Sequence, residues 1–219
     1  MMCCWKKKYN TAINLIDSKN IAVLKERVRI LFIDDEDADI VETLKDRNYN
    51  VYYKNDINYT IEAEPFDVIF LDIRGVAKKL HSSMEGFQMA KEIKKQYPMK
   101  IVYCFSSTTN VAITQELSQN LIDGFIMKDQ DIDKWCEKLD NIIKDYFDRD
   151  KIWQSLEREL RRQEISQQDI KGIQTAYYNS FKTKNFGKLY EKVMGIAQDA
   201  TVVTNLLLNM VEIIKLFIV

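Results

Sequence analysis

The chain alternates short, continuously apolar segments with longer segments whose apolar residues recur three or four positions apart. The clearest apolar segments are VRILFI (28–33), DVIFLD (67–72) and KIVYCFS (100–106), which are rich in β-branched and aromatic residues and too short for helices. Strands that are apolar at every position are buried on both faces, as in a parallel sheet covered by helices on either side. The alternation therefore predicts a doubly wound α/β domain.

The predicted strands and helices follow one another regularly through the middle of the chain. Five strands are expected, at 28–33, 49–54, 67–72, 100–106 and 123–128. The segments between and after them are expected to be helical, at 37–48, 57–64 (a short helix or loop), 85–97, 110–120 and 131–147. Pro98 stops the third of these. Together they predict a five-stranded parallel sheet of the flavodoxin type in a domain of about 120 residues, a typical domain size.

The sequences on either side of this region predict helices and no strands. Residues 5–18 carry apolar side chains at helical spacing, which indicates a short amphipathic helix. After residue 148 the helical patterns are 149–165, 166–181 with Ser166 and Asp169 as a capping pair, a helix capped by Asn185 in which Gly195 is a possible interruption, and 202–219. We therefore expect an N-terminal extension over 1–28, an α/β domain over 29–148 and an all-helical module over 149–219.

Charge is distributed unevenly along the chain. The formal net charge of −1 divides into +4 over residues 1–28, −8 over 29–148 and +3 over 149–219. A charge of +3 over the helical module is a weak field, so DNA binding is not favoured. The four cysteines lack metal-ligand spacing, and the basic N-terminus has no long apolar segment behind it, so a cytoplasmic protein without a signal peptide is expected.

The last segment, 202–219, is the most apolar part of the chain. Its polar residues fall on one narrow helical stripe, and its 18 residues are fewer than the about 20 apolar residues that a spanning helix needs. A helix in a bundle core or a surface for self-association is favoured over a membrane element. A homodimer formed through the C-terminal helices is the expectation.

Acidic residues stand where predicted strands end. Asp34 and Asp35 close the first strand, and Asp72 closes DVIFLD. Ligands bind at the carboxyl ends of the strands of an open parallel sheet, near the point where the strand order reverses. If the two strands are neighbours, three carboxylates meet there, and their repulsion requires a cation. Oxygen ligands alone suit Mg²⁺, although a solvated helix start at Asp34 and Asp35 and a strand-end cap at Asp72 are the simpler alternatives.

Two further polar residues end the later strands. Ser106 closes KIVYCFS, with Ser107 as a possible alternative hydroxyl, and Lys128 closes DGFIMK. At one sheet edge they would add a hydroxyl group and an ammonium group to the carboxylates. A metal ion, a lysine and a hydroxyl around a strand-end aspartate suit phosphoryl transfer, in which the carboxylate attacks phosphorus and the cations neutralise the phosphoryl oxygens. The simpler alternative for Lys128 is a surface lysine.

These motifs, taken in order, resemble the receiver domains of two-component response regulators, the CheY-like family. ILFIDDE resembles the opening strand with its acidic pair, and DVIFLDI the strand that carries the phospho-accepting aspartate. EGFQMAKEIKK is similar to the helix after the family's glycine, and DGFIMK to its aromatic-plus-lysine strand. The 22-residue separation of Ser106 from Lys128 is close to the family's spacing between hydroxyl and lysine. The resemblance covers about 29–147.

The resemblance implies a signalling role and not an enzyme that turns over a substrate. Asp72 would accept a phosphoryl group from a sensor histidine kinase or a phosphotransfer protein. Asp34, Asp35, Asp72 itself and the backbone carbonyl of Arg74 would hold Mg²⁺. The helical module would then transmit the signal through protein–protein contacts.

The remaining residues of the family pattern have matching positions as well. Ser106 would bond the phosphoryl group and Lys128 would pair with it. Phe125 matches the aromatic residue that moves inward with the hydroxyl group, with plain core packing as the alternative. Arg74 and Thr108, each two residues beyond a site residue, match positions that tune the lifetime of the phosphorylated state.

Two departures from the family pattern keep other functions open. The loop 73–85 is longer than in typical receivers, and Asp129 follows the lysine where the family usually has proline. Both are compatible with a pseudo-receiver, a binding scaffold without phospho-switching. A phosphoaspartate-type hydrolase is a third possibility, but it would want a second acid two residues after Asp72, where this chain has Arg74.

Overall fold

The computed structural model describes residues 20–36, 39–78, 85–107 and 121–196 of the 219-residue chain. The described residues form two compact units, one that ends at Tyr146 and one that begins at Phe147. The predicted helices at 5–18, 110–120 and 202–219 lie outside the described residues. The predicted domain limits at residues 28 and 148 stay predictions.

The first unit is built on a five-stranded sheet in the order β2-β1-β3-β4-β5, with every neighbouring pair parallel. The strands are β1 (Ile30–Ile33), β2 (Val51–Lys54), β3 (Val68–Asp72), β4 (Ile101–Ser106) and β5 (Gly124–Met127). The predicted α/β fold with a five-stranded parallel sheet is therefore confirmed. Because β2 lies on one side of β1 and all later strands lie on the other, the strand order reverses between β1 and β3.

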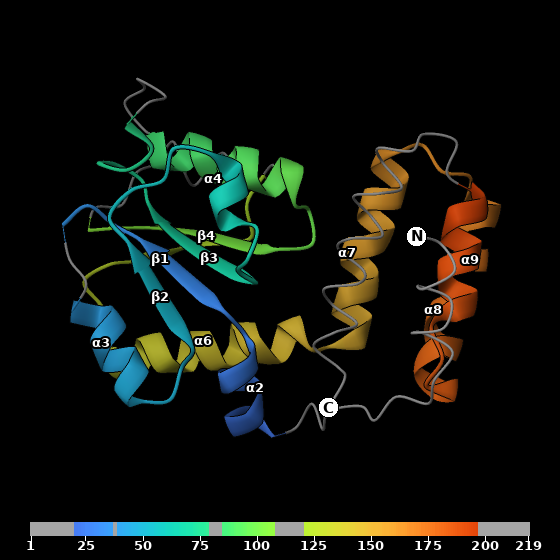
Figure 1. Ribbon diagram of the computed structural model, residues 1–219, viewed down its shortest axis with the longest axis horizontal. Coiled ribbons are helices and arrows are strands. Elements are labelled where there is room, and N and C mark those ends of the chain that lie inside the picture. The colour runs from blue at the N-terminus through green and yellow to red at the C-terminus, as the bar shows by residue number, and fades with distance from the viewer. Residues whose placement is uncertain (1–19, 37–38, 79–84, 108–120, 197–219) are drawn as a thin grey trace. The chain divides into compact units, whose positions relative to one another are not determined.

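The helices of this unit cover both faces of the sheet. They are α2 (Ile21–Arg27), α3 (Asp39–Asp46), the 3₁₀ turn η1 (Thr60–Ala63), α4 (Glu85–Gln96) and α6 (Ile132–Tyr146). Figure 1 shows α4 on one face and α2, α3 and α6 on the other. Helix α2 was not predicted; it packs against α6, and its residue Leu24 is fully buried.

Alternate residues of the central strands face opposite helices, which explains why these strands are apolar throughout. Leu31 and Leu71, both fully buried, belong to a core cluster with Phe87 of α4. Phe32 and Phe70 point the other way, and their ring centroids lie 5.8 and 5.7 Å from that of Trp135 in α6. The side chains of a strand alternate between the two faces of the sheet. Because helices cover both faces, every position of β1 and β3 is buried and polar residues stand only at the strand ends.

The second unit contains three described helices, α7 (Arg149–Arg162), α8 (Gln167–Thr183) and α9 (Gly187–Ile196). The Asp148 carboxylate caps α7, so α6 and α7 are separate helices. The predicted caps are confirmed, because the Ser166 hydroxyl accepts a hydrogen bond from Asp169 N and the Asn185 side chain accepts one from Gly187 N. Gly195 does not interrupt α9.

Aromatic side chains hold these three helices together. Trp153 of α7 lies with its ring centroid 5.5 Å from that of Tyr177 in α8. Phe181 at the end of α8 makes an edge-on contact with Phe186, just before α9, with the ring centroids 5.1 Å apart. Within the described ranges, no helix combines the length and the apolar character needed to cross a membrane.

Candidate metal and phosphoryl site

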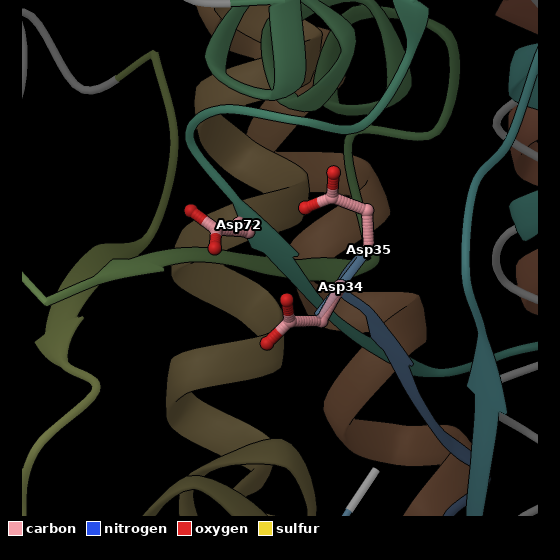
Figure 2. Close-up of side chains that lie close together, drawn as sticks. All are labelled: Asp34, Asp35 and Asp72. Carbon is pink, nitrogen blue, oxygen red and sulfur yellow. The ribbon is translucent and has the colours of Figure 1, made fainter. Parts of the chain in front are cut away.

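Three acidic side chains meet at the carboxyl end of the sheet, where the strand order reverses. In the pairing of β1 with β3, Ile33 lies opposite Leu71, so the next residues along, Asp34 and Asp72, are neighbours. Asp35 follows immediately. One carboxylate oxygen from each of the three lies within 4.8 Å of the others (Figure 2). The structure thus brings together the three acids that the sequence placed at strand ends.

Asp34 is held in place from two sides, although it is a carboxylate at 2% exposure. Its Oδ1 accepts a hydrogen bond from the backbone N–H of Glu36 at 3.1 Å. The hydroxyl group of Tyr53, on the edge strand β2, donates to the backbone carbonyl of Asp34 at 2.6 Å. These bonds fix both the backbone and the side chain at the turn that follows β1.

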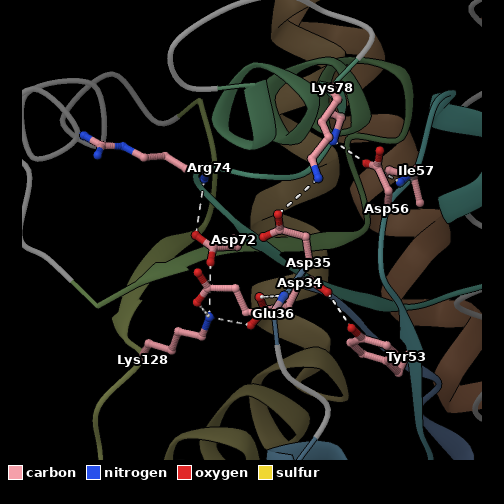
Figure 3. Close-up of polar contacts among 11 residues, drawn as sticks. Asp34, Asp35, Glu36, Tyr53, Asp56, Ile57, Asp72, Arg74, Lys78 and Lys128 are labelled. Atoms are coloured by element: carbon pink, nitrogen blue, oxygen red, sulfur yellow. Dashed lines mark hydrogen bonds and ion pairs between the residues drawn. The ribbon is translucent and has the colours of Figure 1, made fainter.

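Lys128 forms ion pairs with two of the three acids. It follows β5, and its backbone N–H donates to the carbonyl of Ser106 at 2.8 Å, which extends the pairing with β4 by one residue. Its Nζ lies 2.7 Å from Asp34 Oδ2, 3.3 Å from Asp72 Oδ2 and 3.5 Å from Glu36 Oε2 (Figure 3). Partial burial works against the charge of the ammonium, but the bonds to Asp34 and Asp72 outweigh it and raise the pKa of Lys128. An aspartate at position 129 is therefore compatible with an inward-pointing lysine.

The surroundings of Asp72 disfavour the charge of its carboxylate. Burial raises the pKa of its carboxyl group above the ordinary aspartate value, and the charge of Asp34 acts in the same direction. The backbone N–H of Arg74, which donates to Asp72 Oδ1 at 3.3 Å, and the ammonium of Lys128 oppose that shift only in part. Additional positive charge at this edge of the sheet would favour the ionised form that a nucleophilic carboxylate needs.

Asp35 has a different basic partner. Its Oδ2 lies 3.1 Å from the Nζ of Lys78, in the segment that follows β3. This segment passes directly over Asp35, because a Cβ atom added to Gly75 would come 2.1 Å from Asp35 Oδ1. Farther along, the Asp56 carboxylate accepts hydrogen bonds from the backbone N–H groups of Ile57 and Ala77 (Figure 3).

The other residues expected at the site lie around this cluster in different ways. Ser106 is buried at the end of β4, one residue beyond the partner of Asp72, whereas Ser107 is exposed. Phe125 is partly buried against the core cluster on the α4 side of the sheet. The side chain of Arg74 is exposed and points away from the carboxylates (Figure 3). Thr108 lies outside the described residues.

Three residues of this arrangement were not predicted from the sequence. Tyr53 could have been found, since it lies in a predicted strand that neighbours β1. Asp56 and Lys78 stand in loops, and no periodicity or strand-end position distinguishes them. Their contacts follow from the path of the backbone after β2 and β3.

The donor set fits Mg²⁺ in chemistry, size and charge. Six oxygen ligands at about 2.0–2.1 Å place oxygens about 3 Å apart when adjacent and about 4 Å apart when opposite. The three carboxylate oxygens lie within 4.8 Å of one another, so a contraction of about 1–2 Å would bring them to these separations. Two lysines contact four carboxylates, namely Asp34, Asp35, Glu36 and Asp72. In the fully ionised state a charge of −2 remains, which one divalent cation neutralises.

The chain was compared with protein families, curated proteins and solved structures. No family model matches the chain, and no curated protein matches it in sequence. It is similar to the chemotaxis protein CheY4 of Vibrio cholerae, with 22% identity and a TM-score of 0.44 over 52% of this chain and 98% of that chain. It is also similar to the receiver domain of NtrX from Brucella abortus, with 23% identity and a TM-score of 0.44 over 52% of this chain and 98% of that chain. A third similar structure is a CheY-like receiver domain protein from Methanospirillum hungatei, with 20% identity and a TM-score of 0.44 over 54% of this chain and 95% of that chain.

The fold and the site support one description of the first unit. Its strand order, 2-1-3-4-5, is the flavodoxin-like order that CheY also has, with the ligand site at the reversal between β1 and β3. The acidic cluster lies at that reversal. The described remainder of the chain is helical. The first unit thus has the flavodoxin-like fold that CheY also has, and the described residues after it form a helical C-terminal region.

Proposed function

We propose that this chain is a response regulator that accepts a phosphoryl group on Asp72 with the help of Mg²⁺. The observation that carries the proposal is the meeting of Asp34, Asp35 and Asp72 within 4.8 Å, with the Nζ of Lys128 in contact with two of them. A nucleophilic carboxylate, a metal-binding pair and a fixed ammonium are the groups that phosphoryl transfer to an aspartate requires.

Each residue has a defined part in the proposed reaction. An oxygen of Asp72 attacks the phosphorus of a phosphohistidine in a kinase or phosphotransfer protein, so that a P–O bond forms as the P–N bond breaks. Asp34, Asp35, Asp72 and the backbone carbonyl of Arg74 are the proposed ligands of Mg²⁺, which supplies positive charge beside the phosphoryl oxygens. Lys128 pairs with one of these oxygens.

The remaining assignments concern the response of the domain to phosphorylation. The hydroxyl group of Ser106 donates a hydrogen bond to the phosphoryl group, and Phe125 turns inward as the hydroxyl group moves. The side chains of Arg74 and Thr108 control how fast water reaches the phosphoaspartate. The new charge at the strand ends thus changes the conformation of the domain surface, as local modifications of this kind commonly do.

Binding of beryllofluoride, a stable mimic of the phosphoryl group, tests this proposal. With Mg²⁺ present, fluorine NMR should show a bound beryllofluoride signal for the wild-type protein and none for Asp72→Asn. Asp133→Asn is the matched control, because it makes the same change at an exposed aspartate whose ion-pair partner is Arg47. A signal that persists in Asp72→Asn would reject Asp72 as the acceptor.

We propose that the helical module transmits the signal of the phosphorylated domain through protein–protein contacts, including self-association by residues 202–219. Support comes from the apolar character of that segment and from the weak positive charge of residues 149–219. Size-exclusion chromatography of the full chain and of a chain that ends at residue 201, each with and without beryllofluoride, tests this part. Equal elution volumes for the full chain in both conditions, both corresponding to a monomer, would contradict it.

A pseudo-receiver scaffold is the second candidate. The observation in its favour is that Lys128 and Lys78 already contact all three acids of the cluster. A scaffold of this kind would bind Mg²⁺ no better in the wild-type form than in Asp35→Ala. A titration that shows tighter binding by the wild-type protein would exclude the scaffold.

A further inference from the structure

The two lysines at the site divide the three acids between them. Lys128 contacts Asp34 and Asp72, whereas Asp35 forms its ion pair with Lys78 at 3.1 Å. The environments of the two lysines also differ, since the side chain of Lys128 is 21% exposed and that of Lys78 is 61% exposed. Lys78 is thus the accessible and more readily displaced of the two.

The backbone that carries Lys78 is fixed even though the lysine side chain is exposed. Val76 and Ala77, the two residues before it, are fully buried. Ala77 has φ +56°, a left-handed conformation that a residue with a Cβ atom rarely adopts, and its N–H is bonded to the Asp56 carboxylate. The anchored turn therefore delivers the lysine to the edge of the acidic cluster.

The close approach of this turn to Asp35 depends on a glycine. Gly75 has φ +79°, and any Cβ atom at this position would collide with the carboxylate of Asp35. The turn thus covers one side of Asp35 with backbone and places an ammonium group on its Oδ2 atom. Asp35 is presented to solvent as half of an ion pair and not as an open ligand.

We infer that Lys78 is a built-in competitor for the divalent cation at Asp35 and sets the concentration of Mg²⁺ at which the site fills. The inference rests on the proposed function, because it takes Asp35 as a ligand of Mg²⁺. A divalent cation at the cluster needs an oxygen of Asp35 and would lie close to the ammonium of Lys78. The ammonium of Lys78 therefore competes with the cation for the charge of the Asp35 carboxylate, and the pair lowers the affinity for the metal.

The size of the effect follows from the exposure of the pair. Exposed ion pairs contribute about 0.2–1 kcal/mol, which corresponds to an about 1.5- to 5-fold change in a dissociation constant. Removal of the ammonium should therefore tighten Mg²⁺ binding by this factor at low ionic strength. Salt at about 0.5 M should reduce the difference, because exposed charges are then screened within about 4 Å.

The test is a calorimetric titration of Mg²⁺ into metal-free full-length protein, with three lysine substitutions compared. Lys78→Met removes the charge and keeps most of the side-chain length, and Lys78→Arg keeps the charge. Lys45→Met is the matched control, because Lys45 is also an exposed lysine in an ion pair, with Glu42 on α3. Tighter binding is expected for Lys78→Met alone, with Lys78→Arg and Lys45→Met close to wild type.

The outcomes separate this inference from the proposed function. If Asp35→Asn weakens Mg²⁺ binding but Lys78→Met does not tighten it, the inference is overturned and the metal site is kept. Equal tightening by Lys78→Met and Lys45→Met would overturn it as well, because the effect would then come from net charge alone. A wild-type protein that binds no Mg²⁺ would overturn the metal site and the inference together.

Discussion

Asp72 combines burial with the charge of a neighbouring acid, and both raise the pKa of its carboxyl group. In the unfolded chain the pKa returns to about 3.9, so the folded protein holds the proton of Asp72 more tightly. At a pH above the folded pKa, the ionised side chain of Asp72 therefore lowers the free energy of unfolding. This loss of stability disappears as the pH falls and the carboxyl group takes up its proton.

Asp72→Asn should remove this loss of stability. At pH 7, without Mg²⁺, the variant should have a higher free energy of unfolding than the wild type, measured by urea unfolding. The difference should shrink as the pH falls toward the unfolded value, because the wild-type carboxyl group then becomes neutral too. A variant that is less stable at pH 7, or a difference that does not depend on pH, would contradict the account of Asp72.

Lys128 should stabilise the folded domain through its contacts with Asp34 and Asp72. Lys128→Met leaves these mostly buried carboxylates without their cation, and we expect a loss of about 1–3 kcal/mol in the free energy of unfolding at pH 7. Saturating Mg²⁺ should recover part of the loss. Lys45→Met, at an exposed pair, should change stability by less than about 0.5 kcal/mol in the same urea titration, and an equal effect of both variants would argue against a special role for Lys128.

Which of these contacts could be predicted depends on how each residue is positioned. Asp34 and Asp72 stand at the ends of neighbouring parallel strands, so strand order alone brings them together. The contact of Lys78 with Asp35 depends on a turn that contains Gly75 at φ +79° and Ala77 at φ +56°. No local pattern in the sequence specifies that path, and the contact appears only in three dimensions.

The same distinction holds for strands and helices. The predicted strands follow one another along the chain as the observed strands do, and each extends past the observed bounds by one or two residues at one or both ends. Val28 is an example: it is buried and apolar, but its N–H bonds to the carbonyl of Leu24 and closes α2. Helix α2 has 7 residues, too few for helical periodicity to separate it from the strand that follows.

The start of α4 is packed tightly against the strand that carries Asp72. A Cβ atom added to Gly86 would come 1.8 Å from the backbone oxygen of Asp72. Gly86→Ala should therefore force strand and helix apart and lower the free energy of unfolding by about 1–3 kcal/mol, with weaker Mg²⁺ binding, since overpacking strains the backbone.

Gly195→Ala in α9 is the matched control for Gly86→Ala. An added Cβ atom at Gly195 meets nothing within 4 Å, so the helix-favouring alanine should stabilise that helix by about 0.5–1 kcal/mol. Both variants can be followed by circular dichroism during thermal unfolding. Equal behaviour of the two alanine variants would contradict the close packing at Gly86.

The two units divide the chemistry of the chain. All described residues of the site lie in the unit that ends at Tyr146, and the caps at Asp148 and Ser166 belong to the helical unit. A chain that ends at residue 146 should therefore fold and bind Mg²⁺ within about two-fold of the full chain, as measured by circular dichroism and calorimetry. Loss of binding in a folded fragment would show that the helical unit contributes to the site.

Phosphorylation of Asp72 is the central claim, and the most direct measurement is mass spectrometry of the protein treated with acetyl phosphate and Mg²⁺. The account predicts one added phosphoryl group, lost when Mg²⁺ is chelated beforehand, with borohydride reduction and peptide mapping locating it at Asp72. An unmodified protein under these conditions, or a phosphoryl group on any other residue, would contradict it.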